Sequence, residues 1–371
     1  MRIAFVHYPG RIARLDDARA GRAPTEFLFG AVELERRGID VAHFEIDPNR
    51  RPGVPGAVFD RLTYRGYLPP HVTSTTLRQA HGLLGALSRF DAIVATTAGT
   101  ALSLAAWARV RRPPPLLGIV TGLTDRAHRR TRRMIVARLL RELHAMLYGE
   151  AELPSMLALD RRLAGRVHVN QFGVDSRFWT QSSEPEDDYV LAIGNDGRRD
   201  YETLVRAAPQ IPTAVRIFTN HPRPASLPRN VTWELADWHR QVLTDVEVRS
   251  LYRGARAVVV PLRESIQPSG QSVTLQAMAC GKPVVLTETD GLWSRAAIRD
   301  GENVLLVPSG DPATLARRVA ELLDSPGLGS SLGARARSSV LEIATVDLFA
   351  DRMLSLCRSA VEADGDLRRH G

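Results

Sequence analysis

The sequence predicts an α/β protein made of two doubly wound domains, each a parallel sheet covered by helices. Two observations predict this fold class. Short apolar strand patterns alternate with amphipathic helix patterns, which is typical of parallel sheets with right-handed crossovers. The same rhythm starts again after residues 181–188, a polar and acidic run without apolar periodicity. With 371 residues, the chain is long enough for two domains that each bury a core.

The individual elements follow from these patterns. A helix is expected to open at Pro24 and to stop at Gly38, where glycine favours the left-handed end of a helix. A long helix is expected over roughly residues 126–147, and a last one over about 345–362. Strands are predicted at 1–7, 41–46, 91–95, 116–120 and 167–169, and then at 189–193, 214–219, 230–233, 257–261, 283–287 and 304–307.

Composition narrows the class of protein. A hydrophobic content of 44% and a charged content of 24% are typical of soluble globular proteins. No window approaches 18 uninterrupted apolar residues, and residues 1–6 are too short for the core of a signal peptide, so we expect a cytoplasmic protein. Cys280 and Cys357 have neither metal-ligand spacing nor a disulfide framework.

The positive charge is concentrated in the first half. Residues 1–180 contain 27 arginines and 16 acidic residues, a net charge of +11, whereas residues 181–371 have a net charge of −3. Lys282 is the only lysine, so the excess reflects a bias toward arginine, and we expect no nucleic-acid partner. Seven arginines without an acid lie between residues 126 and 141, interleaved with apolar residues. This pattern favours contact with an anionic membrane or a negatively charged acceptor, or simply a surface helix packed on the sheet.

Residues 269–285 carry the most informative pattern. A turn of small residues opens a helix that Gly281 stops, and Pro283 begins a buried strand. Such a helix start leaves backbone N–H groups free, and its dipole favours an anion such as a diphosphate. An ordinary helix-to-strand unit explains the same pattern.

This segment resembles the signature of retaining glycosyltransferases of the family 4 type, Glu-Ala-Met-Ala-Cys-Gly-x-Pro-Val-Val. Residues 172–179, 189–204 and 300–308 resemble further motifs of that family in the same order. The resemblance implies a GT-B fold, with two Rossmann-like domains facing across a cleft. The acceptor domain would comprise residues 1–180 and a terminal helix (about 345–371), and the nucleotide-sugar domain residues 181–344.

The resemblance also implies donor-site residues. Arg199 matches a basic residue that neutralises the leaving diphosphate, with Arg198 as its partner, and both are expected to take part in catalysis. Guanidinium groups suit this task because they bind phosphate oxygens in pairs. The other donor-binding candidates are Gly194, Gln267, Ser269, Gly270, Gln271, Ser272 and Gln276.

Gln276 is a departure from the family, which places a ribose-binding glutamate at this position and another eight residues earlier. Pro268 stands at the earlier position, so Glu264 and Gln267 are the candidates for the first polar group. An amide still donates and accepts hydrogen bonds, but the negative charge is lost. The identity of the donor is therefore left open: UDP- and GDP-linked sugars are the main candidates, other nucleotides stay open, and the base is expected near Trp233 to Trp238.

On the acceptor side, the candidates are His7 and Gly10, at the end of the first strand. A histidine with a near-neutral pKa can orient an acceptor hydroxyl or take its proton, although a histidine packed in the loop fits as well. Family members often carry another histidine where Thr121 and Gly122 stand here. No metal is expected, because the only Asp-x-Asp, Asp364 to Asp366, lies in the polar tail. No cofactor is expected beyond the nucleotide sugar as co-substrate.

These observations favour a glycosyltransferase that moves a sugar from a nucleoside diphosphate to the hydroxyl of a small molecule, glycan or lipid-linked acceptor, with retention of configuration. Contact with the inner face of the membrane is a further expectation. Two alternatives stay open: a nucleotide-sugar epimerase or hydrolase of the same fold, and a catalytically silent protein that binds nucleotide sugars. An NAD-dependent oxidoreductase is disfavoured because no Gly-x-Gly-x-x-Gly follows the first strand.

Overall fold

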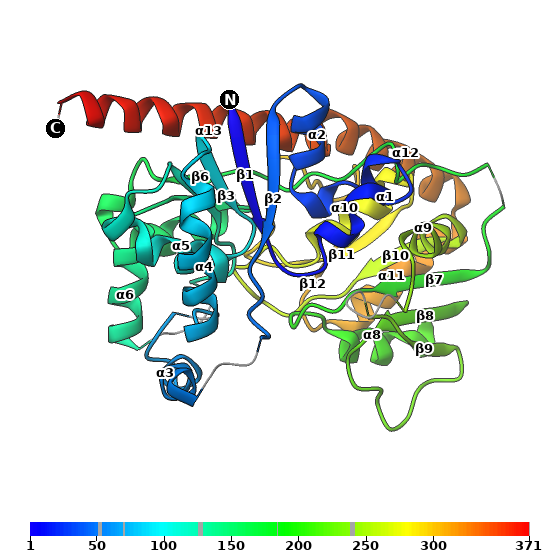
Figure 1. The fold of residues 1–371 in the computed structure, drawn as a ribbon. Helices are drawn as coiled ribbons and strands as arrows, with labels where there is room; N and C mark the ends of the chain where they lie inside the picture. The colour runs from blue at the N-terminus through cyan, green and yellow to red at the C-terminus, as the bar shows by residue number, and fades with distance from the viewer. Residues whose placement is uncertain (51–53, 70, 125–128, 184, 238–241, 371) are drawn as a thin grey trace. The chain divides into compact units, whose positions relative to one another are not determined.

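The computed structural model describes residues 1–371 except 51–53, 70, 125–128, 184, 238–241 and 371 (Figure 1). The chain divides into two compact units. The first contains Met1–Arg19, Phe27–Gln171 and Phe349–Gly371. The second contains Ala20–Glu26 and Phe172–Leu348.

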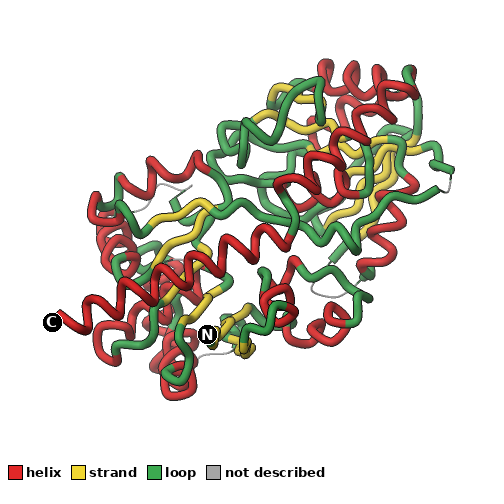
Figure 2. Tube along the Cα trace, turned by 90° about the horizontal axis from the view of Figure 1, so that it is seen from above, coloured by secondary structure: helices red, strands yellow, loops and turns green. Residues whose placement is uncertain are grey.

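The first unit is built on a parallel sheet in the order β2-β1-β3-β4-β5-β6. Its strands are β1 (Arg2–His7), β2 (Asp40–Glu45), β3 (Ala92–Ala95), β4 (Leu116–Ile119), β5 (His144–Leu147) and β6 (Val167–Val169). Its helices are α1 (Leu15–Arg19), α2 (Ala31–Arg36), α3 (Val54–Tyr64), α4 (Ser74–Leu87), α5 (Ala98–Arg111), α6 (Arg130–Leu140) and α7 (Leu153–Leu157). The last helix, α13 (Val346–His370), is one long, uninterrupted helix near the C-terminus (Figure 2).

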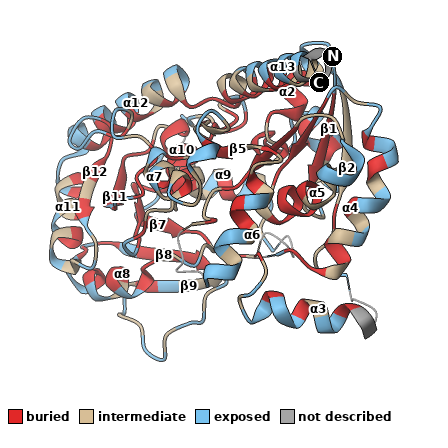
Figure 3. Ribbon diagram, turned by 90° about the vertical axis from the view of Figure 1, so that its left-hand side faces the viewer, coloured by how far each residue is buried: buried red, intermediate tan, exposed pale blue. Residues whose placement is uncertain are grey.

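Both faces of this first sheet are buried, because successive side chains of a strand point to opposite sides. In β1, Ala4 and Val6 pack with residues of α4, α5 and α6. Ile3 and Phe5 pack on the other side with residues of α2 and α13, among them Val32, Phe349 and Met353. The inner strands β1, β3, β4 and β5 are accordingly buried over most of their length, whereas the edge strands β2 and β6 are only half-buried (Figure 3).

The second unit has a parallel sheet in the order β12-β11-β10-β7-β8-β9. Its strands are β7 (Tyr189–Ile193), β8 (Ala214–Thr219), β9 (Val231–Leu235), β10 (Ala257–Val260), β11 (Val284–Glu288) and β12 (Leu305–Pro308). Its helices are α8 (Tyr201–Ala207), α9 (Asp245–Gly254), α10 (Gln271–Ala279), α11 (Pro312–Asp324) and α12 (Pro326–Ile343). The expectation of two doubly wound α/β domains is thus confirmed.

Two predicted helices were wrong in extent. The helix expected from Pro24 begins at Ala31, because Gly30 adopts φ +82° and a Cβ there would lie 3.0 Å from the Cβ of Ala350. The helix expected over 126–147 ends at Leu140, and residues 144–147 form β5. A short, fully buried apolar run fits helix and strand alike, so periodicity does not separate them. Helices α3 and α4 lie in a stretch without predicted elements.

Candidate functional site

The order of strands in the second unit reverses between β7 and β10. From β7 the chain continues to β8 and β9 on one side, and from β10 to β11 and β12 on the other. Open parallel α/β sheets bind ligands at the carboxyl ends of the strands that flank such a switch point. The turn at residues 194–200 follows β7 and the loop at 261–270 follows β10, so both predicted donor-binding segments lie at this edge.

The two segments meet at Leu262. The backbone of Arg199 forms an isolated bridge with Leu262, and the N–H of Arg263 donates to the carbonyl of Arg198 at 2.8 Å. Gly270 lies against the same leucine, since a Cβ at Gly270 would come 3.3 Å from its Cδ1. The turn after β7 and the turn that opens α10 therefore flank one residue.

Gly194 allows the turn after β7 to pass close to a cation. Its φ is +145°, and a Cβ at this position would lie 2.5 Å from the guanidinium of Arg199. The Gly194 carbonyl accepts hydrogen bonds from the hydroxyls of Tyr201 at 2.7 Å and Thr219 at 2.8 Å. Tyr201 also packs edge-on against Trp233, in the region where we expected the base. Trp238 lies outside the described residues.

Arg199 is almost completely buried, with only 3% of its surface exposed. Its Nε donates to Asp196 Oδ2 at 2.6 Å, and among the described residues its Nη1 has no hydrogen-bond partner. Burial is the largest single effect and acts against the positive charge, but Asp196, Tyr201 and Tyr252 together raise the pKa of Arg199. Arg198 is half-buried beside it, with its backbone N–H bonded to Asp196. The turn thus holds one buried cation with an unused donor.

The turn before α10 brings a second set of unused polar groups. Gly270 adopts φ +72° directly before the helix, and a Cβ there would lie 2.7 Å from Val260 Cγ1. Gln271 is buried, and within the described residues neither its amide nitrogen nor its amide oxygen has a partner. Ser272 beside it is half-buried. A buried polar group without a partner costs about 1–3 kcal/mol, which favours a ligand or water at this place.

The loop that leads to this turn is held by its own hydrogen bonds. The N–H of Ser269 donates to the carbonyl of Gln267 at 2.7 Å, and the N–H of Gln267 donates to Ser265 Oγ at 2.9 Å. Glu264 accepts from the N–H groups of Ser265 and Asp290. Its carboxylate therefore fixes the loop, while the side chain of Gln267 stays half-buried.

Gln276 lies further along α10 in a buried hydrogen-bond network. Its Nε2 donates to Glu26 Oε1 at 3.0 Å, and its Oε1 accepts from the hydroxyl of Tyr252 at 3.1 Å. Glu26 was not among the predicted site residues. It stands 250 positions away in the sequence, and no motif marks it. The predicted contact of Gln276 with a ribose stays a prediction.

In the first unit, His7 ends β1 beside β3, where that sheet reverses its strand order. The ring is fully buried, and its Nε2 lies 3.0 Å from Nδ1 of His43, which in turn lies 3.0 Å from Glu35. Burial, with His43 and Arg11 nearby, lowers the pKa of His7 to about 3. This differs from the near-neutral pKa that we expected, and it leaves His7 a neutral ring and a weak base.

The rest of the predicted acceptor side is partly exposed. Gly10 is exposed with φ +85°. The N–H of Gly122 donates to the buried Glu152 at 2.5 Å, and burial raises the pKa of Glu152 to about 7. Glu152 is a second buried carboxyl that the motifs did not indicate. In the part of the chain that the structure describes, no group of three histidine, cysteine or acidic residues gathers as a metal site would require.

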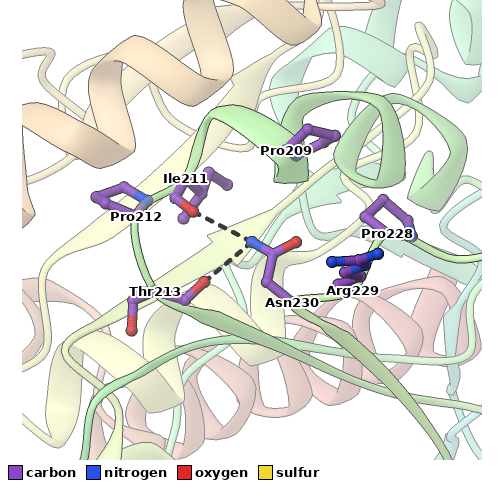
Figure 4. A pocket seen from close by; sticks show the side chains of 7 residues that line it. All are labelled: Pro209, Ile211, Pro212, Thr213, Pro228, Arg229 and Asn230. Carbon is purple, nitrogen blue, oxygen red and sulfur yellow. Dashed lines mark hydrogen bonds between the residues drawn. The ribbon is translucent and has the colours of Figure 1, made fainter.

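A cavity of about 490 Å³ lies elsewhere in the second unit (Figure 4). It is lined by residues that precede β8 and β9, so it lies at the amino ends of the strands, opposite the switch-point edge. The side chain of Asn230 links the loop before β9 to the loop before β8 by donating to the carbonyls of Ala208, Ile211 and Thr213. The lining residues are Pro209, Ile211, Pro212, Thr213, Pro228, Arg229 and Asn230.

Comparison with known proteins relates this second unit to transferases. Residues 187–325 match the family model described as glycosyl transferases group 1. D-inositol 3-phosphate glycosyltransferase of Streptomyces bingchenggensis is 35% identical over 127 residues, which cover 32% of this chain and 24% of that protein. The enzyme of the same name from Thermomonospora curvata is 31% identical over 174 residues, 46% of this chain and 34% of its own. The matched stretches thus span about a quarter to a third of these relatives.

Solved structures share the fold over nearly the whole chain. Sucrose-phosphate synthase from Thermosynechococcus elongatus superposes with a TM-score of 0.71 at 19% identity, covering 98% of this chain and 100% of that one. Anabaena HepE in complex with UDP-glucose gives 0.68 at 16% identity, covering 97% and 100%. None of the described helices combines the length and the apolar composition that a membrane-spanning segment needs. The chain therefore has the fold of these solved structures, and its residues 187–325 match the model of the group 1 glycosyl transferases.

Proposed function

We propose that this protein is a retaining glycosyltransferase that moves a sugar from a nucleoside diphosphate to an acceptor hydroxyl. The observation that carries the proposal is the meeting, at Leu262, of the turn after β7 and the turn before α10. Both turns stand at the switch point of the second sheet, where such sheets bind nucleotides. The family match over residues 187–325 supports the same class of activity.

The electrostatics of this edge suit a diphosphate. The first N–H groups of α10 have no acceptors within the helix, and the helix dipole favours an anion there. Arg199 adds a buried guanidinium with one donor unused among the described residues, and Gln271 adds a buried amide. We propose that these groups bind the diphosphate. The half-buried Arg198 would contact it from the solvent side.

In the proposed reaction, the bond between the anomeric carbon and the diphosphate oxygen breaks. The acceptor oxygen then bonds to that carbon on the same face, which retains the configuration, and the acceptor proton passes to the departing diphosphate. The charge that develops on the leaving group is stabilised by donors already in place. One such donor commonly contributes about 2.7–4 kcal/mol.

The first experiment is a calorimetric titration with UDP, GDP, ADP and dTDP. The solved HepE structures contain UDP or UDP-glucose, so we expect UDP to bind, with GDP as the second candidate. Incubation with the sugar-linked form of the nucleotide that binds and a panel of acceptors then follows. The coupling constant of the anomeric proton in the product reports whether configuration is retained. A protein that binds none of the four nucleotides would contradict the proposal.

The same assay separates the two alternatives. An epimerase or hydrolase of this fold releases nucleotide, or changes the sugar, at full rate without an acceptor. A silent binding protein binds the nucleotide sugar but turns over none across the acceptor panel.

We also propose that the first unit contacts an anionic membrane through a surface formed by α3, its following turn and α6. Arg132 of α6 joins them, since its Nε donates to the carbonyl of Leu68 at 2.6 Å, and the Arg129 guanidinium lies 4.5 Å from the centre of the Tyr67 ring. Tyr64 is 83% exposed and Met134 67% exposed. The other exposed members are Val58, Leu62, Arg61, Arg65, Arg130 and Arg133. Exposed apolar side chains among arginines suit an anionic lipid surface. Arg126 lies outside the described residues.

Sedimentation with vesicles tests this surface. We expect binding to phosphatidylglycerol vesicles at low salt and none to phosphatidylcholine vesicles. Reversing two charges, with Arg130→Glu and Arg133→Glu together, should weaken binding at least ~30-fold, because each basic residue contributes about 1 kcal/mol. The control is Arg161→Glu with Arg162→Glu, another exposed pair of the first unit. The membrane proposal would be wrong if both double variants lost vesicle binding equally, or if the unaltered protein did not bind the vesicles.

A further inference from the structure

A buried carboxyl, Glu26, is bound on both of its oxygens within the second unit. Its exposed fraction is 1%. Oε1 accepts from the indole N–H of Trp179 at 2.6 Å and from Gln276 at 3.0 Å, and Oε2 accepts from the backbone N–H of Asp175 at 3.0 Å. The neighbouring Thr25 donates from its hydroxyl to Asp175 at 3.1 Å. Thr25 and Glu26, the first residue of η2 (Glu26–Leu28), are thus fixed within the second unit by buried hydrogen bonds.

The network determines how the Gln276 amide is oriented. Its nitrogen faces the Glu26 carboxylate, and its oxygen faces the hydroxyl of Tyr252 on α9. Trp179 closes the cluster, because its ring packs edge-on against Tyr252 with the ring centres 5.7 Å apart. Gln276 is itself only 5% exposed. Through these two polar atoms, α10 is hydrogen-bonded to Glu26 and to Tyr252 of α9.

We infer that Glu26 is a positioning residue which, through Gln276, holds helix α10 and the diphosphate site at its N-terminus in place. The inference rests on the proposed function for the role of that site. It assigns Gln276 to the framework of the site, in contrast to a ribose-binding role. It also explains why residue 276 is an amide: a glutamate here would place a second carboxyl about 3 Å from Glu26, where two like charges repel.

No cation binds Glu26 among these contacts; the nearby Arg177 is paired with Asp175, with its Nε 3.4 Å from Oδ1. Asp175 adds a like charge, whereas Trp179, Gln276 and Tyr252 are neutral groups. Burial is the main reason that the pKa of Glu26 rises to about 7, and the hydrogen bonds from Trp179 and Gln276 oppose the rise. The native protein keeps this proton to about pH 7, whereas the unfolded chain releases it near the ordinary value of 4.5. The free energy of unfolding should therefore fall as the pH rises from about 4.5 to 7.

The decisive variant is Gln276→Glu, which changes one atom type and keeps the shape. Two adjacent carboxyls share a proton at pH 6.5, and the shared proton replaces the lost hydrogen bond. We therefore expect the affinity for UDP to stay within about threefold of the unaltered protein at pH 6.5 and to fall at least tenfold at pH 9.5, where both groups ionise. The double variant Glu26→Gln with Gln276→Glu removes one charge and should recover most of the affinity at pH 9.5.

The control is Gln210→Glu, the same replacement at an exposed site of the second unit, which should change the affinity at neither pH. A ribose-binding role predicts the opposite for Gln276→Glu. Restoring the carboxylate that the resembling family carries would leave UDP binding equal or tighter at both pH values. That result would overturn the inference.

A second measurement needs no nucleotide. In protein labelled with ¹⁵N-indole tryptophan, five side-chain signals are expected, and Trp179→Phe identifies the one that donates to Glu26. We expect this signal to titrate with a midpoint near pH 7. A signal that stays constant between pH 5.5 and 9, at the chemical shift of an indole N–H without a hydrogen bond, would contradict the contact between Trp179 and Glu26 on which the inference rests. A protein that shows the titration but binds none of the nucleotides would contradict the proposed function alone.

Discussion

Replacing Arg199 with alanine is expected to lower kcat/KM about 10²–10³-fold and to weaken UDP binding. The reason is the loss of a preorganised, buried cation at the position proposed for the diphosphate. The guanidinium is buried, and among the described residues its Nη1 has no partner within the protein. Steady-state kinetics and calorimetry measure both effects, with thermal unfolding recorded alongside.

Two further variants separate this role from a structural one. Arg199→Lys keeps the charge and should recover much of the activity, though not the paired geometry of a guanidinium. Arg206→Ala removes an exposed arginine on α8 and should leave the kinetics unchanged. Asp196 is 37% exposed in its side chain, so water can solvate it once Arg199 is gone, and we expect a stability loss of only about 1–3 kcal/mol. A variant that loses stability but keeps its kinetics would show that Arg199 is structural.

Gly270→Ala is expected to abolish measurable nucleotide binding and to destabilise the protein strongly. Two costs combine at this position. The φ of +72° disfavours any side chain, at about 1–3 kcal/mol, and the added Cβ would lie 2.7 Å from Val260 Cγ1. Relieving that clash costs a further 1–3 kcal/mol or so, and it displaces the turn that presents the N-terminus of α10. Denaturant unfolding and UDP titration measure the two effects.

Gly310→Ala is the matched control. Gly310 has the same φ of +72°, but nothing lies within 4 Å of the position of an added Cβ. It should show the backbone cost alone and keep UDP affinity. If the two variants lost the same stability and both bound UDP normally, close packing at Gly270 would have no part in the site.

Much of the fold could be predicted from local pattern. Strands such as β7, β8 and β11 are short apolar runs bounded by polar or turn residues, and they lie within a residue or two of their predicted positions. Gly281 stops α10 as predicted, with φ +72°. Local sequence failed at β5, where Ala145 to Leu147 are buried on all sides and carry no period that distinguishes strand from helix. It also failed at Gly30, whose conformation depends on Ala350, far along the chain.

In the candidate site, too, some features could be predicted from local sequence and others could not. The turns at Gly194 and Gly270 could be predicted, because small residues between a strand and a helix are a local signal. The side-chain contacts of Gln276 could not. Its side-chain partners, Glu26 and Tyr252, are brought to it only by tertiary structure. The low pKa of His7 follows from burial and from His43, which no spacing in the sequence reveals.

The packing of α13 has a consequence for the order in which the protein matures during synthesis. Ile3 and Phe5 are covered on one side by Phe349, Met353 and Cys357. A ribosome that has completed residue 171 must still translate the whole second unit before those side chains emerge, roughly 10–40 s at about 5–20 residues per second. Throughout that interval the nascent first unit exposes an apolar sheet face, so its dependence on chaperones should be greatest before translation ends.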